Sequence, residues 1–166
     1  MRDHCQICGH KVKEDRCAKC GADDMERLVA GCHGADRVSR LSERMVNIIL
    51  TDRRLLVFDD NVSAVVAGGA AGGGVIGLLI TRTVTKNMTL KNGKKDLDIA
   101  LSAIRTLQRQ DVTRGVRVGV HLLVGVDDKT THDLFIGESF THPRMPPEYF
   151  VQVVGETARR PVDIVA

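Results

Sequence analysis

Aromatic residues are scarce in this chain of 166 residues, which holds four Phe, one Tyr and no Trp. Proteins that bind single-stranded nucleic acid usually stack the bases on aromatic side chains. The shortage of rings therefore argues against that class of binding protein. It also means that any hydrophobic core must be built from aliphatic side chains.

A secretion signal is also missing, because residues 1–20 are polar and contain no apolar run. Cysteines in a reducing compartment rarely form disulfides. We therefore expect a cytoplasmic protein whose five cysteines stay reduced. Close pairing of four of them points to a metal site instead.

The overall composition is that of a folded protein with one main domain, since 43% of the residues are hydrophobic and 27% are charged. The net charge of +3 is small. Basic residues are nevertheless concentrated in one run without an intervening acid, which either contacts an anionic partner or is a solvated loop. The run consists of Arg82, Lys86, Lys91, Lys94 and Lys95.

Two C-x-x-C-G units, at 5–9 and 17–21, stand near the N-terminus. The glycine after each pair permits the left-handed backbone conformation that brings two thiolates onto one ion. Two such turns supply four soft ligands in a tetrahedron, which is the arrangement that structural zinc prefers. We predict a structural, non-catalytic Zn²⁺ site. Its ligands are Cys5, Cys8, Cys17 and Cys20.

The metal should contribute folding energy of about 10 kcal/mol, because so short a segment cannot bury enough apolar surface to order itself. The fifth cysteine, Cys32, is interpreted as a small buried thiol on a strand. The doublet CQICGH and CAKCGA resembles the short zinc ribbons found at the N-termini of many prokaryotic proteins. In those families the ribbon contacts protein or nucleic acid and precedes a separate domain. We therefore predict a ribbon at 1–23 and a second domain at 24–166.

Short apolar runs after the ribbon predict a β domain. A first strand is expected at 26–34, with Leu28, Ala30 and Cys32 on one face. The polar stretch 35–44 carries Arg37, Arg40 and Arg44 at roughly helical spacing, and they form either a short basic face or, as we favour, a solvated loop. A hairpin is predicted from 45–50 and 54–58, two aliphatic runs around a polar turn.

The hairpin sequence ILTDRRLLVF resembles a segment typical of GRAM-type and bacterial pleckstrin-homology-like (PH-like) domains. The resemblance implies a mainly β fold, in which a bent antiparallel sheet of about seven strands is closed by a C-terminal helix. The chain departs from the family's lipid binders, because their basic pattern is missing from the first hairpin, and this departure argues against a specific phosphoinositide pocket.

Periodicity in the C-terminal half agrees with that architecture. Residues 116–126 alternate with period two, which predicts a strand with one buried face, and a further strand is expected at 131–137. Pro146 and Pro147 open a predicted helix whose apolar residues recur at helical spacing, and Pro161 ends it.

No catalytic motif accompanies the acids, bases and nucleophiles of the chain, so we predict a non-enzyme with no catalytic residues. His121 is expected on the solvent face of its strand. The residues considered were His121, His132, Asp133, Glu138, Ser139 and His142.

An uncharged stretch at 62–81 interrupts the β domain and is treated as an insert at 61–81. It has the length of a membrane span, and Gly69, Gly73 and Gly77 recur at fours, as in closely packed helices. A single span is excluded, because it would place two parts of one sheet on opposite sides of a membrane. The remaining alternatives are a hairpin that enters one leaflet or packs against copies of itself, and a loop with no membrane role.

Together these features predict a non-enzymatic adaptor. Its insert and basic run would meet an anionic membrane surface or a protein partner, including a second copy in a homo-oligomer. The location would be cytoplasmic, with peripheral contact at the inner face of the membrane. The competing hypothesis is a soluble module in which the ribbon binds protein or nucleic acid, with nucleic acid the less favoured partner.

Overall fold

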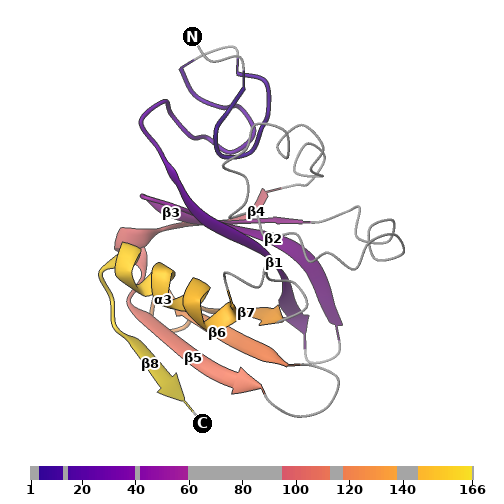
Figure 1. Cartoon of the computed structure of the whole chain (residues 1–166), viewed down its shortest axis with the longest axis vertical. Helices are drawn as coiled ribbons and strands as arrows, with labels where there is room; N and C mark the ends of the chain where they lie inside the picture. The colour runs from indigo at the N-terminus through magenta and orange to yellow at the C-terminus, as the bar shows by residue number, and fades with distance from the viewer. Residues whose placement is uncertain are drawn as a thin grey trace.

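The computed structural model describes residues 4–12, 15–39, 42–59, 95–112, 118–137 and 146–165. These residues form a mainly β structure with one C-terminal helix and an N-terminal cysteine cluster, which confirms the predicted fold class (Figure 1). The elements are β1 Leu28–Ser39, β2 Ser42–Thr51, β3 Arg54–Asp59, β4 Lys95–Ala100, η3 Leu101–Ala103, β5 Thr106–Val112, β6 Gly119–Gly125, β7 Thr131–Gly137, α3 Pro147–Ala158 and β8 Val162–Val165.

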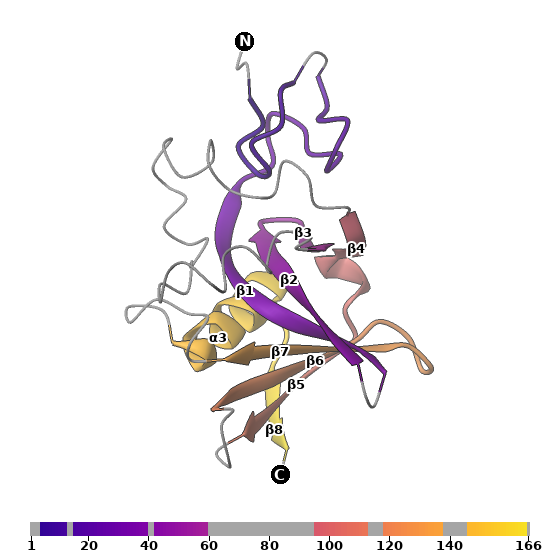
Figure 2. The same ribbon diagram turned by 90° about the vertical axis from the view of Figure 1, so that its right-hand side faces the viewer.

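The strands form one sheet in the order β4-β3-β2-β1-β7-β6-β5-β8. Two antiparallel meanders, β1 to β4 and β5 to β7, join where β1 pairs with β7. The short strand β8 follows the helix and pairs parallel to β5. Figure 2 shows how strongly the strands twist relative to one another, with α3 lying against one face of the sheet.

We call the face that α3 covers the inner face. Its core is mainly aliphatic, as the shortage of aromatic residues predicts, and Phe150 of α3 is fully buried in it. Strand β6 supplies Val120, Leu122 and Val124, which confirms the period-two prediction over the described part of 116–126.

The predicted hairpin is confirmed as β2 and β3, with Ile49 opposite Leu56. The predicted helix is confirmed as Pro147–Ala158, and Arg159 ends it in the left-handed conformation with φ of 53°. The prediction of about seven strands missed β8, because its four residues are too few to establish a period.

The prediction of a loop at 35–44 is wrong, because its described residues are the paired ends of β1 and β2. Asp36 lies opposite Arg44 across the hairpin, and Ala35 also lies opposite Phe135 of β7. Polar composition does not prevent strand formation where the backbone is paired on both sides. Arg40 lies outside the described residues.

The predicted face of the first strand is only partly correct. Ala30 and Cys32 lie in the inner core, and Cys32 is the buried strand thiol that was expected. Leu28 instead packs on the opposite side, against the cysteine cluster. The register of β1 shifts between Leu28 and Ala30. One extra residue in a strand reverses the faces of all residues beyond it.

The chain leaves and re-enters the sheet at neighbouring positions around 60–94, since Phe58 of β3 lies opposite Lys95 of β4. The segment between them lies outside the described residues, and so do the predicted glycines Gly69, Gly73 and Gly77. The same holds for most of the basic run, namely Arg82, Lys86, Lys91 and Lys94. In the described part of the chain, no helix has the length and apolar character needed to cross a bilayer.

Candidate metal centre

The two cysteine units fold into knuckles with the same hydrogen bonds. In the first, the backbone N–H of Cys5 donates to the carbonyl of His10 at 2.8 Å, and that of Gly9 donates to Cys5 at 2.9 Å. The second repeats both bonds twelve positions later, from Cys17 and Gly21. Both glycines have positive φ, 70° and 76°, as the predicted turn requires.

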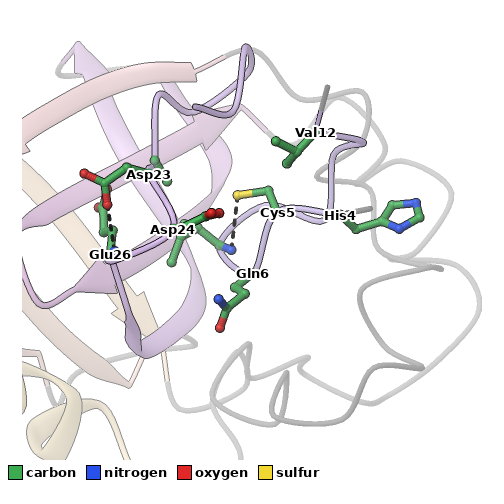
Figure 3. Close-up of a pocket in the computed structure, with 9 residues that line it drawn as sticks. His4, Cys5, Gln6, Val12, Asp23, Asp24 and Glu26 are labelled. Carbon is green, nitrogen blue, oxygen red and sulfur yellow. Dashed lines mark hydrogen bonds between the residues drawn. The ribbon is translucent and has the colours of Figure 1, made fainter. Parts of the chain in front are cut away.

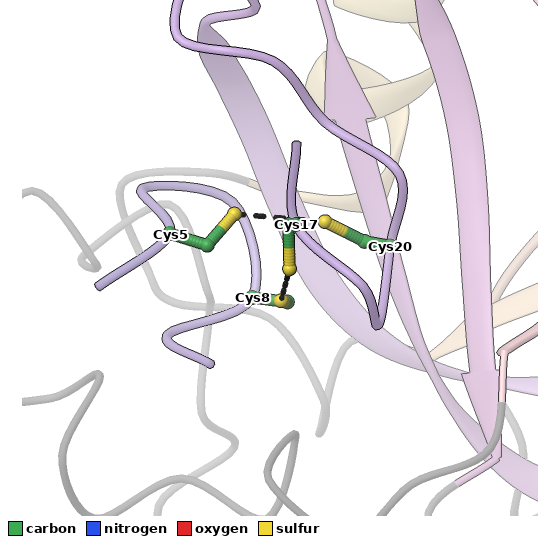
Figure 4. Close-up of side chains that lie close together, drawn as sticks. All are labelled: Cys5, Cys8, Cys17 and Cys20. Carbon is green, nitrogen blue, oxygen red and sulfur yellow. Dashed lines mark hydrogen bonds between the residues drawn. The ribbon is translucent and has the colours of Figure 1, made fainter. Parts of the chain in front are cut away.

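The four predicted ligands come together at one buried point (Figure 4). All four sulfur atoms lie within 4.8 Å of one another. Two contacts join one knuckle to the other, with 3.5 Å between the sulfurs of Cys5 and Cys20 and the same distance between those of Cys8 and Cys17. Four cysteines this close can bind a metal ion.

Hydrogen bonds among the thiols shift the pKa values of Cys5, Cys8 and Cys20. A hydrogen bond with the Cys20 thiol is the main cause that lowers the pKa of Cys5, to about 2. Hydrogen bonds with Cys20 and Cys5, together with burial, raise the pKa of Cys8. The hydrogen bond with Cys5 is the main cause that raises the pKa of Cys20, to about 12. The pKa of Cys5 is therefore shifted in the opposite direction from those of Cys8 and Cys20.

The donor set fits a soft divalent cation that takes four ligands. A metal would offset the repulsion between four buried thiolates, and zinc in such a closed shell has no open position for a substrate. The backbone N–H of Ile7 also points at the sulfur of Cys5, 3.4 Å away, and stabilises its thiolate form. His4 and His10 are not part of the cluster.

The knuckles pack on the sheet, on the face opposite α3, which we call the outer face. Their cysteines form one buried cluster with Ile49 of β2 and with Leu56 and Phe58 of β3. Both faces of β2 and β3 are therefore buried here. Unbroken apolar runs are typical of strands covered on both sides, so the lack of alternation at 45–50 and 54–58 was the sequence signal for this contact.

Arg54 of β3 joins the knuckles to the sheet. Its Nη2 lies 2.6 Å from Oε2 of Glu26, a side chain that is only 3% exposed. Its Nη1 donates to the carbonyl of Cys20 at 3.1 Å and to Asp98 of β4 at 2.8 Å. The hydrogen bond with Glu26 is the main cause that raises the pKa of Arg54. Sequence analysis missed this arginine, because its partners are far apart in the chain.

A small hollow beside the first knuckle is lined partly by acidic residues (Figure 3). The carboxylates of Asp23 and Glu26 already accept hydrogen bonds from other groups of the protein. Asp23 accepts hydrogen bonds from two backbone N–H groups and from Arg53, and Glu26 accepts them from Arg54 and Thr51. Among the described residues, the four cysteines are the only group of three or more side chains placed to hold a metal ion.

His121 and Asp133 form a pair that the sequence did not reveal, with 2.6 Å between Nδ1 and Oδ1. His121 lies on the outer face, as the alternation predicts, but it is half-buried and its ring centroid is 5.1 Å from that of Phe135. His132 lies on β7. Glu138, Ser139 and His142 lie outside the described residues.

Comparison with known proteins gave no family assignment. No family model and no curated protein matches the chain. Among solved structures, the chain is similar to the hSac2 domain of the human phosphoinositide phosphatase Sac2. The similarity has a TM-score of 0.49 and 9% sequence identity, over 87% of this chain and 81% of that one. A match at this level assigns no function.

Metal binding at pH 7 is expected to release protons, because the thiols of Cys8 and Cys20 have raised pKa values and hold protons until a cation displaces them. Affinity should therefore fall as the pH falls. Calorimetric titration with Zn²⁺ in buffers of different ionisation enthalpy measures the released protons. Cys32→Ala should behave as wild type, and a heat independent of the buffer would contradict the prediction.

Proposed function

We propose that this protein is a non-enzymatic adaptor in which zinc-bound knuckles stabilise a PH/GRAM-like sheet. The insert at 61–81 then meets an anionic membrane surface or a second copy of the chain. The observation that carries the proposal is the pairing of Phe58 with Lys95, which holds both ends of the 60–94 segment at one edge of the sheet.

This arrangement supports an insert that leaves and returns on the same side of a membrane. A single crossing would have to separate β3 from β4, which are hydrogen-bonded neighbours. Glycine disfavours a lone helix in water by about 1 kcal/mol per residue relative to alanine. An uncharged stretch with this many glycines is therefore expected to need contact with lipid or with a protein partner to become ordered.

The basic residues beside the insert supply the attraction to an anionic surface. Lys95 is already engaged by Asp98, with 2.7 Å between Nζ and Oδ2. The proposal therefore assigns the surface contact to the rest of the run. These residues are Arg82, Lys86, Lys91 and Lys94.

Removal of residues 62–80, with a short Gly-Ser linker in their place, should abolish membrane binding or self-association. The neighbouring strand ends allow the linker to close the sheet without strain. Wild-type protein should sediment with phosphatidylserine vesicles at low salt, or have a multimeric mass in light scattering, and the variant should do neither. A soluble, monomeric wild-type protein would refute the proposal.

Removal of positive charge distinguishes binding to a membrane from self-association. Because each cation near an anionic surface contributes about 1 kcal/mol, replacing Lys86, Lys91 and Lys94 by Ala should weaken vesicle binding on the order of a hundredfold. Lys129→Ala, in the exposed turn after β6, should leave it unchanged. Self-association through glycines should survive both changes.

A further inference from the structure

Strands β2 and β3 separate two buried clusters. On the inner face, Ile48, Leu55 and Val57 belong to the large core beneath α3. On the outer face, Ile49, Leu56 and Phe58 belong to the smaller cluster that the knuckles complete. The three outer side chains are fully buried, so the knuckles act as a cover over an apolar strip of the sheet.

The cover has little apolar surface of its own. Apart from the cysteines, its contribution to the cluster consists of Ile7 and Ala22, with Val12 at its margin. A segment of this size needs metal ligation to hold its shape. Metal ligation by the cysteines would therefore hold the cover in the shape that fits the sheet, beside the contact of Arg54 with the Cys20 carbonyl.

The cover also carries a group that favours detachment. Nζ of Lys19 is buried with no hydrogen-bond partner, 5.9 Å from the centre of the Phe58 ring. A buried amine without a hydrogen bond gains one only by returning to water.

We propose that the knuckles are a metal-dependent cover: removal of the ion detaches them and exposes Ile49, Leu56 and Phe58, while the sheet stays folded. This inference rests on the zinc site of the proposed function. The sheet is expected to stay folded because the residues of the inner core come from the strands, from η3 with the residue that follows it, and from α3, and none comes from the knuckles.

The absence of tryptophan allows a single fluorescent reporter. Phe58→Trp places it beneath the cover, and Phe150→Trp places a matched control in the inner core, where Phe150 is equally buried. After zinc is removed by a chelator, the emission of the first variant should shift to longer wavelength and recover when zinc is restored. The second should not shift, and far-ultraviolet circular dichroism should be retained.

Two results would overturn the inference. A red shift of both reporters would mean that the metal holds the whole protein together. No shift of the Phe58→Trp reporter, with loss of metal verified by mass spectrometry, would mean that the cover stays in place without the ion. Protein purified with zinc that contains none would instead refute the zinc site itself.

Wild-type protein provides a measurement that does not depend on either variant folding. On chelation, binding of a hydrophobic dye should rise while backbone amides of β6 and β7 keep their protection from hydrogen exchange. A rise accompanied by loss of that protection would overturn the inference, and so would the absence of a rise.

Discussion

Replacement of Cys8 by Ser is expected to abolish stoichiometric zinc binding and to unfold the knuckles. Cys8 is buried, and its sulfur lies 3.5 Å from that of Cys17 in the other knuckle. The loss of one thiolate opens the closed shell and removes most of the folding energy that the metal supplies, which is on the order of 10 kcal/mol for such modules.

Metal content by mass spectrometry and limited proteolysis of residues 4–23 measure this effect. Cys32→Ala is the matched control, because Cys32 is also fully buried but lies in the inner core, away from the cluster. It should bind one equivalent of zinc and keep the knuckles resistant to protease. Full zinc content in Cys8→Ser would show that the four cysteines are not the ligand set.

Arg54→Met should destabilise the protein by about 3 to 5 kcal/mol, since it leaves the buried carboxylate of Glu26 without its ionic partner. Methionine keeps much of the apolar stem, so the loss falls on the polar contacts. The carbonyl of Cys20 and the carboxylate of Asp98 also lose a donor. Urea unfolding of the zinc-loaded protein measures the change in free energy.

The adjacent arginine provides a matched control. Arg53 also forms an ion pair, at 2.8 Å from Asp23, but its side chain is 48% exposed. Exposed pairs contribute about 0 to 1 kcal/mol, so Arg53→Met should change stability little. Equal effects of the two variants would contradict the role of Arg54. In Arg54→Met with Glu26→Leu, much of the loss should be recovered, because the unpaired charge is gone.

Local patterns were enough to predict several elements of the fold. The β2 and β3 hairpin follows from two aliphatic runs around a polar turn, and the buried face of β6 follows from its alternation. The helix Pro147–Ala158 follows from its prolines and apolar spacing. Each depends on residues within a few positions of one another.

The errors arose where distant pairing decides the structure. Residues around Asp36 and Arg44 look like a polar loop, but the backbone of β1 is paired with both β2 and β7. Leu28 changes face because of a register shift that no local pattern indicates. Neither pairing leaves a periodic signal in the residues concerned.

The sequence by itself determined which four cysteines come together, because two C-x-x-C-G turns need only local backbone geometry to present their thiols. Only the tertiary structure decided where the knuckles pack. They cover Leu56 and Phe58. Beside them, Arg54 forms ion pairs with Glu26 and Asp98. The physical reason is the separation in sequence between the residues that interact. A turn is specified by adjacent residues, whereas burial of a sheet face and pairing of distant charges depend on the register of strands far apart in the chain.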